Sequence, residues 1–228
     1  MYIRDAIMFP YLAGTTFLQQ VLRAGSGSGW EEFHKRVFSN PPVSTQQILH
    51  PELYLAGVAP RPVTLPDLTR VLPKGYRRLD ENLVGEFGLR GILKQYLGKE
   101  RAEEHSRAWA GDRYAIYEDE AGKEIALLFR VRLESVEAAA RFFGQYSDLL
   151  EQKYAVRRKL VRRPNFFSFD SDDGGVFLYC VGDECLTLEG ADRAVFDRAV
   201  SALKWHSAPP APARKPAKTI AALMPALR

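Results

Sequence analysis

The spacing of apolar residues changes near residue 110, and this change constrains the fold more than any single motif. Before that point the spacing is helical, most regularly over 81–97, where Asp80 is placed to cap the helix. After it, short alternating segments bounded by turn residues predict strands, with amphipathic helices between and after them. The strands are expected at 113–117, 125–133, 165–169, 175–181 and 185–188, and the helices at 134–154 and 192–204. The predicted class is therefore α+β: an N-terminal helical layer, covering one face of a sheet, followed by a ββαβββα antiparallel-sheet module.

The same pattern divides the chain into three parts. Residues 1–111 are expected to form a helical half, residues 112–206 an α+β accessory module, and residues 207–228 a tail rich in Pro, Ala and Lys. A chain of 228 residues is long enough to bury a sizeable core. Residues 207–218 cannot bury enough apolar surface to order themselves, so we expect the tail to be disordered.

The net charge of +4 comes from the tail. The segment from residue 207 onward holds four basic residues and no acidic one, so the remaining 28 basic residues are balanced by 28 acidic ones. Binding to a phosphate backbone requires basic side chains gathered on a folded face. We therefore expect no nucleic-acid partner.

Hydropathy along the chain predicts no membrane span. No apolar run approaches the roughly 20 residues that cross a bilayer, and the N-terminus lacks the pattern of a signal peptide. We expect a soluble chain. Because an internal start at Met1 stays open, neither the localisation nor the oligomeric state is assigned.

The segment PPVSTQQILHPELYL places a helix start, an amide pair and one histidine within a short stretch. Ser44 or Thr45 can serve as the N-cap of a helix, and Gln47 stands where a capping box with Ser44 would need it. Pro51 breaks that helix, so His50 is expected at its end. His50 then has two interpretations: it caps the helix end, or it has a role in a functional site.

Four blocks of the sequence resemble a known family. FPYLAGTTFLQQVL (9–22), PPVSTQQILHPELYL (41–55), LVGEFGLRGIL (83–93) and WAGDRYAIYE (109–118) are similar, in this order, to the second half of a bacterial and archaeal family of uncharacterised zincin-type metallopeptidases. The resemblance extends over about Phe9 to Phe143. In that family the HExxH helix, which holds zinc and the general base, lies upstream of the first block.

This chain contains no H-E-x-x-H sequence, and its histidines do not have the helical spacing of a ligand pair. The resemblance thus implies a non-catalytic C-terminal portion that contributes a wall of the substrate cleft. Zinc is expected only together with the missing upstream half. That half and a peptide substrate are the two partners that the resemblance implies. The alternative is a stand-alone binding or interaction module without enzymatic activity.

The resemblance also suggests roles for three residues. His50 is a candidate donor of a hydrogen bond to the oxyanion formed during peptide hydrolysis, and Glu52 could orient its ring. We expect His50 to line a concave surface together with the helices at 9–22 and 81–97. Glu86 is a candidate neighbour of the missing metal site, as is Asp112, and the alternative for both acids is an ion pair or a helix cap.

Cys180 and Cys185 flank a predicted two-residue turn at 182–183. Such a turn places the two cysteines opposite each other on paired strands, close enough for a disulfide. The sequence leaves open whether they form that bond or remain two free thiols, because the compartment is unknown.

Two charged runs admit a binding and a structural interpretation. The run at 153–163 holds six basic residues, and we interpret it as a solvated helix end and loop, balanced by nearby acids, rather than as an anion site. The run at 170–175 begins like a calcium loop but lacks the later ligands, so a hairpin turn is expected there.

Overall fold

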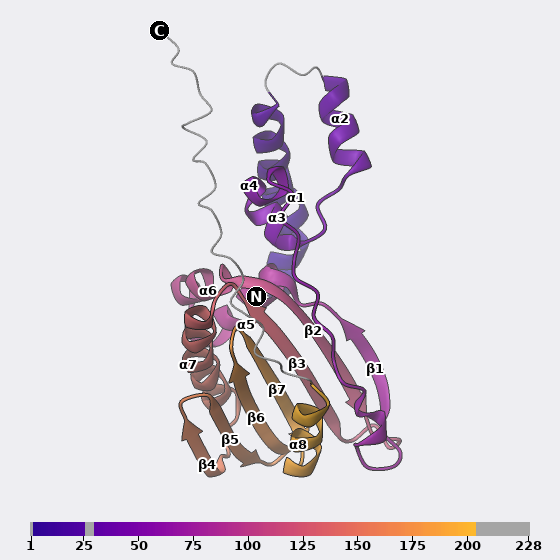
Figure 1. Cartoon of the computed structure of the whole chain (residues 1–228), viewed down its shortest axis with the longest axis vertical. Coiled ribbons are helices and arrows are strands. Elements are labelled where there is room, and N and C mark those ends of the chain that lie inside the picture. Colours follow the sequence, from indigo (N-terminus) through magenta and orange to yellow (C-terminus); the bar gives the residue numbers. More distant parts are fainter. Residues whose placement is uncertain (1, 26–29, 204–228) are drawn as a thin grey trace. The chain divides into compact units, whose positions relative to one another are not determined.

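The computed structural model describes residues 2–25 and 30–203 (Figure 1). Contacts within the described part of the chain divide it into two compact units, residues 3–59 and residues 60–203, which we call the helical unit and the sheet unit. The predicted tail at 207–228 and most of the glycine-rich connection at 25–29 lie outside the described residues. No helix of the described residues is both long and apolar enough to cross a membrane.

The helical unit contains four helices around a small aromatic core. They are α1 (Tyr2–Ala24), α2 (Trp30–Ser39), α3 (Thr45–Leu49) and α4 (Pro51–Leu55). Phe17 and Val21 of α1 are buried against Tyr54 of α4, and the rings of Phe17 and Tyr54 meet edge to face at 5.0 Å. The hydroxyl of Tyr54 donates to the carbonyl oxygen of Asn40 at 2.7 Å, which fixes the chain entering α3.

The predicted N-cap at Ser44 is confirmed, but the reciprocal bond from Gln47 ends on Val43, one residue before the N–H group that a capping box would use. Ser44 is the N-cap, and its Oγ accepts a hydrogen bond from the backbone N–H of Gln47 at 3.2 Å. The side chain of Gln47 in turn accepts from the backbone N–H of Val43 at 2.7 Å. Pro51 then begins α4, as its fixed φ allows at the first helical position.

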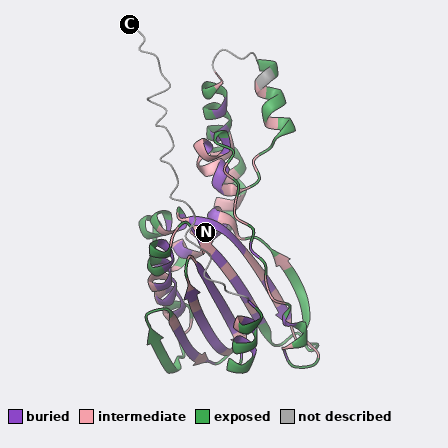
Figure 2. Ribbon diagram, viewed as in Figure 1, coloured by how far each residue is buried: buried purple, intermediate pink, exposed green. Residues whose placement is uncertain are grey.

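The sheet unit is built on seven antiparallel strands, in the order β1-β2-β3-β7-β6-β5-β4 (Figure 1). The central strands are mostly buried, while the two edge strands are exposed (Figure 2). The strands are β1 (Arg77–Asn82), β2 (Trp109–Glu118), β3 (Ile125–Leu133), β4 (Arg158–Arg163), β5 (Phe166–Ser171), β6 (Gly174–Val181) and β7 (Glu184–Ala191). The fold class is α+β, with helices first and an antiparallel sheet after them, as the sequence predicts.

Helices cover both faces of this sheet. On one face lie α5 (Gly85–Leu97), α6 (Lys99–Ser106) and α7 (Val136–Lys153), and on the other lie α8 (Arg193–Ala202) and a short 3-10 helix, η1 (Leu68–Arg70). The core on the α7 side includes Trp109, Phe142 and Phe167, and the core on the α8 side includes Tyr117 and Phe196. The central strands are therefore covered on both faces, whereas the edge strands β1 and β4 stay exposed.

Strand β1 differs from the sequence prediction, which began a helix at Glu81 with Asp80 as its cap. Asp80 lies within the strand opposite Ile116 of β2, and its carboxylate accepts a hydrogen bond from the hydroxyl of Tyr114 at 2.6 Å. Helix α5 begins only at Gly85. The predicted cap is thus wrong, because pairing with β2 takes the chain around Asp80 into the sheet.

The boundary between the units also differs from the predicted division at residue 111. Residues 60–111 belong to the sheet unit. Arg61 donates from its backbone N–H to Ala110 O at 2.7 Å and from its guanidinium to Asp183 Oδ2 at 2.6 Å. These bonds, with the pairing of β1 and β2, tie the segment to strands that follow it by many residues.

The predicted hairpin of the two cysteines is confirmed. Cys180 of β6 lies opposite Cys185 of β7, and the turn contains Gly182 with φ of 60°. The Cα atoms of the cysteines are 4.0 Å apart, and the two side chains form a disulfide. Of the two alternatives that the sequence leaves open, the structure has the bond.

Reduction of this disulfide is expected to lower the free energy of unfolding by about 2 kcal/mol, because the closed loop is short and restricts the unfolded chain little. Urea unfolding with and without a thiol reductant measures the change. The double variant Cys180→Ala, Cys185→Ala is the control, and its stability should not respond to reductant. An equal response of that variant would assign the effect to something other than the bond.

Candidate functional site

His50 lies where α3 ends and α4 begins. Its backbone N–H donates to Gln46 O at 2.8 Å, so its main chain terminates α3. Its Nδ1 atom lies 3.9 Å from Oε1 of Glu52, a distance for an ion pair rather than for a hydrogen bond. The His50 side chain is 14% exposed. The structure therefore brings the predicted pair together at a helix junction.

Buried amide side chains hold this junction in place. Gln46 and Gln47 are 2% and 5% exposed. The Nε2 atom of Gln47 donates to Val58 O at 2.8 Å, which ties the loop after α4 back to α3. These bonds give His50 a defined backbone position. A side chain that must contact a particular substrate atom needs such a support.

The concave surface predicted around His50 requires helices from both units. The helix with the first resemblance block, α1, belongs to the helical unit together with His50, whereas α5 belongs to the sheet unit. The surface therefore stays a prediction.

Glu86 lies in the first turn of α5, and its side chain is fully buried. Arg90, four residues further on the same helix, places Nη2 at 3.2 Å from Oε1 of Glu86. This spacing puts both side chains on one face of the helix. The arrangement matches the ion-pair alternative for Glu86, and a role beside a metal stays a prediction.

Asp112 of β2 caps α5 from a neighbouring strand. Its Oδ1 accepts from the backbone N–H of Val84 at 2.8 Å, and its Oδ2 accepts from the N–H of Gly85 at 2.7 Å and from the indole of Trp109 at 2.6 Å. Burial raises the pKa of the Asp112 carboxyl, and these three hydrogen bonds oppose the rise. The arrangement matches the cap alternative for Asp112.

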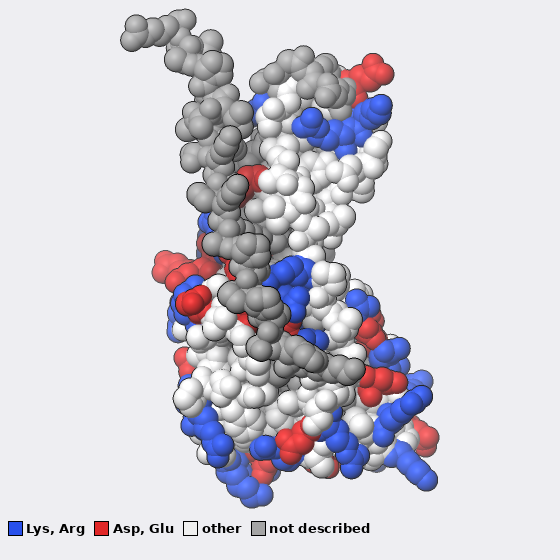
Figure 3. Space-filling model, viewed as in Figure 1, with Lys and Arg blue, Asp and Glu red and all other residues white. Residues whose placement is uncertain are grey.

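The basic run at 153–163 includes the edge strand β4 rather than a loop. Its charges are balanced as predicted, since four of its cations contact acids, among them Lys153, which lies 2.6 Å from Glu189. The other three pairs are Arg158 with Asp172 (2.9 Å), Lys159 with Asp170 (3.0 Å) and Arg162 with Glu151 (2.9 Å). Figure 3 shows basic side chains along this edge at the lower left, with acidic ones interspersed over the sheet unit. Charged side chains on an exposed edge also oppose pairing with another chain.

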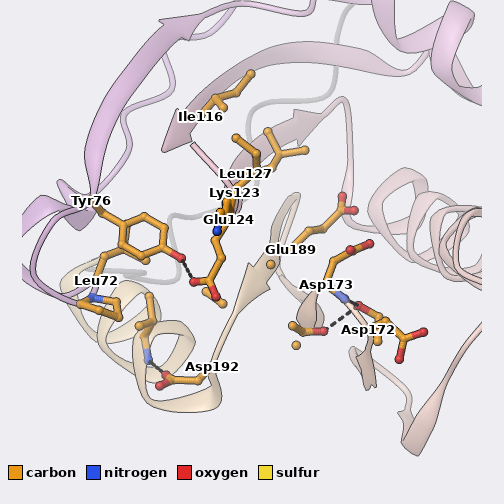
Figure 4. A pocket seen from close by; sticks show the side chains of 18 of the residues that line it. Leu72, Tyr76, Ile116, Lys123, Glu124, Leu127, Asp172, Asp173, Glu189 and Asp192 are labelled. Carbon is orange, nitrogen blue, oxygen red and sulfur yellow. Dashed lines mark hydrogen bonds between the residues drawn. The ribbon is translucent and has the colours of Figure 1, made fainter. Parts of the chain in front are cut away.

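A cavity of about 860 Å³ opens at one end of the sheet, and the sequence did not predict it. It lies where the β2–β3 turn, the β5–β6 turn and the segment from β7 to α8 come together (Figure 4). Its apolar wall includes Leu72, Ile116, Leu127 and Val195. Its charged residues are Lys123, Glu124, Lys153, Asp172, Asp173, Glu189 and Asp192.

Glu189 is the most buried charged residue of this cavity, at 3% exposure. It lies on β7 opposite Leu127, so both side chains point to the face that α7 covers. Lys153 Nζ and the hydroxyl of Tyr154 each lie 2.6 Å from its Oε2. Burial, and then the charge of Glu189, raise the pKa of Tyr154, so its hydroxyl remains a donor at neutral pH.

A second tyrosine–carboxylate pair lies on the other side of the cavity (Figure 4). The hydroxyl of Tyr76 donates to Glu124 Oε2 at 2.7 Å. Burial, and then this hydrogen bond, raise the pKa of Tyr76. Both phenols thus hold carboxylates in place without neutralising their charge.

Sequence reasoning missed the cavity because its residues come from distant turns that meet only in the folded chain. The predicted hairpin turn at 170–175 is confirmed, and Ser171 Oγ donates within it to Gly174 O at 2.7 Å. One local signal was available. Glu189 is an acid within a strand whose neighbours are buried, and buried acids are rare unless paired.

These sites differ in the chemistry that they allow. The His50–Glu52 pair can present a hydrogen-bond donor, and the cavity can bind a small ligand. Within the described part of the chain, no group of three His, Cys, Asp or Glu side chains is arranged to hold a metal ion. The side chains that the structure describes therefore do not fit a zinc site.

Comparison with known proteins identifies one family. Residues 70–206, which include all seven strands and α5 to α8, match the family described as Domain of unknown function (DUF8575). No curated protein and no solved structure matches the chain. Because the family match covers more than half of the residues, this protein belongs to the family described as Domain of unknown function (DUF8575).

Proposed function

We propose that this protein is the non-catalytic C-terminal portion of a zincin-type metallopeptidase-like protein, in which the helical unit contributes part of the substrate-cleft wall. The packing of the resemblance blocks supports this role. The first two blocks pack on each other through Phe17 and Tyr54, and the last two are joined where Asp112 caps α5. A fold shared with the resembled family would require contacts of this kind between the blocks.

The observation that carries the proposal is the position of His50. It lies in the second block at a turn fixed by Pro51, with Glu52 at 3.9 Å from its ring. A carboxylate beside an imidazole favours one orientation of the ring. Such a histidine can donate a hydrogen bond to the oxyanion that forms when a peptide carbonyl is attacked.

The proposal assigns no hydrolytic step to this chain by itself. Peptide hydrolysis of the zincin type requires a metal-bound water and a glutamate base from an HExxH helix, and this sequence has no such motif. A segment carrying that helix is therefore the partner that the proposal needs. The accessory role of the sheet unit does not depend on it.

Replacing His50 by Ala tests the proposal. In a complex or fusion with an HExxH-bearing half from the resembled family, hydrolysis of a fluorogenic peptide is expected to fall about a hundredfold, because one oxyanion donor is lost. The zinc content, measured by elemental analysis, is expected to stay unchanged, since His50 is not a ligand in this scheme.

His34→Ala is the matched control. His34 belongs to α2 of the same unit and stacks on Phe38 at 4.3 Å, so its loss should leave turnover unchanged. Equal turnover of the His50→Ala variant and the unmodified complex would remove His50 from the site. If no HExxH-bearing half gains activity with this chain, the alternative of a stand-alone binding module holds.

A further inference from the structure

We propose that the cavity at the end of the sheet binds an alkylammonium group, meaning a primary amine on an aliphatic chain, as in a lysine side chain or a free diamine. The site belongs to the sheet unit alone, so it stands whether or not the chain acts beside a peptidase. It is assigned from the size, the charge and the unoccupied acceptors of the cavity.

The size and the wall of the cavity fit a small ligand with an apolar part. Its volume of about 860 Å³ lies in the range of small-molecule sites. Ile116, Leu127 and Glu189 form one cross-strand row, so an apolar surface leads directly to a carboxylate. Methylene groups pack on such a surface while an ammonium group at their end meets the acid.

Carboxylates outnumber cations in this cavity. Five acids and two lysines line it. Two of the acids have a cationic partner, since Glu189 pairs with Lys153 and Asp172 with Arg158. The other three are Glu124, bonded to a tyrosine hydroxyl, Asp192, bonded to a backbone N–H, and Asp173.

Lys123 is the one remaining lysine of the lining, so negative charge remains in excess. A concave site lined mainly by one sign of charge concentrates ligands of the opposite sign. An anionic ligand would be repelled by this excess of negative charge. Lys153, the cation beside the buried acid, is already held by Glu189.

Two acceptors on one side of the cavity define where the ammonium group would bind. Both hydrogen bonds to Glu189 end on Oε2, and within the described residues Oε1 accepts none. The carboxylate of Asp173 likewise makes no hydrogen bond or ion pair with the described residues.

Asp173 and Glu189 both act electrostatically on Tyr154, so the two carboxylates lie near one phenol. Figure 4 shows them on the same side of the cavity. An ammonium group has three donors and can satisfy both.

A titration of the full chain tests this site. The probes are 1,5-diaminopentane and N-acetyl-lysine amide, with N-acetyl-glutamate amide as the probe of opposite charge. Backbone amide shifts in nuclear magnetic resonance spectra should move at the turn of Asp173 and near Glu189 with the amines only. Binding should weaken as sodium chloride is raised, since the contact is ionic and partly exposed.

Asp173→Asn is the main variant, because Asp173 is exposed and its loss should not disturb folding. We expect it to weaken amine binding about three- to fivefold, as for the loss of one partly exposed charge pair. Glu189→Gln is the second variant and should weaken binding further. Glu103→Gln is the control, because it removes one negative charge from an exposed position of α6, outside the cavity, and should leave affinity unchanged.

Each outcome decides the assignment. Binding of the diamine alone identifies a free diamine as the ligand class, and binding of the lysine amide identifies a basic side chain of a peptide. Absence of binding by both amines overturns the proposal, as does binding that Asp173→Asn and Glu189→Gln leave unchanged. Tighter binding of N-acetyl-glutamate amide at the same residues would keep the cavity as a site but reject its cationic ligand.

Discussion

Replacing Asp112 by Ala is expected to lower the free energy of unfolding by roughly 4 kcal/mol. Its carboxylate accepts from the N–H groups of Val84 and Gly85 and from the indole of Trp109. Asp112 and Trp109 are each 2% exposed, so water cannot replace these bonds without a change in packing. The variant leaves buried donors without an acceptor and removes the cap of α5. Urea unfolding followed by tryptophan fluorescence and circular dichroism measures the loss.

Asp80→Ala is the matched control for this change. Asp80 is the residue that the sequence predicted as the cap, but it lies on the exposed strand β1, and among the described residues its side chain bonds only the hydroxyl of Tyr114. Its loss should cost less than about 1 kcal/mol, as for other exposed polar contacts. A larger cost for Asp80→Ala than for Asp112→Ala would restore the predicted cap and contradict the observed start of α5.

Replacing Gly190 by Ala is expected to destabilise the protein by about 3 kcal/mol or more. Gly190 has φ of +78°, and a Cβ atom added there would lie 2.0 Å from the backbone oxygen of Ile125. An alanine therefore meets both an unfavourable backbone conformation and a clash with a strand that cannot move alone. Thermal unfolding measures the change, with an expected decrease of roughly 6 °C or more in Tm for a domain of this size.

Gly182→Ala separates the two causes. Gly182 also has a positive φ, +60°, but a Cβ atom there would meet nothing within 4 Å. The control should therefore show only the backbone cost of about 1 to 2 kcal/mol. Equal losses in the two variants would mean that the close approach of β7 to β3 at Gly190 is not important for stability.

The sequence predicted the features that depend on neighbouring residues. The cap of Ser44 on the N–H of Gln47 needs only a spacing of three residues, and the hairpin of Cys180 and Cys185 needs only a two-residue turn between alternating segments. The helix predicted at 134–154 likewise follows from its own amphipathic spacing, and the structure has α7 there with Ser135 as its N-cap. Local geometry fixes each of these, so they can be read without the rest of the chain.

The two edge strands could not be read in this way. β1 and β4 are polar and exposed, so neither shows the alternation of buried and exposed residues by which a strand is recognised. Their strand conformation comes from hydrogen bonds to β2 and β5, which lie elsewhere in the sequence. The boundary predicted at residue 111 differs from the structure for the same reason, since β1 belongs to the sheet.

The same distinction between local and long-range interactions applies to the candidate sites. The sequence by itself determined the α+β class, the turn at His50 and the cysteine hairpin, because periodicity, caps and turns act over a few residues. Only the tertiary structure decided that Asp112 caps α5, that Glu86 pairs with Arg90 in a buried position, and that distant turns enclose Glu189 in a cavity. Burial and long-range pairing set these roles, and both depend on which segments meet when the chain folds.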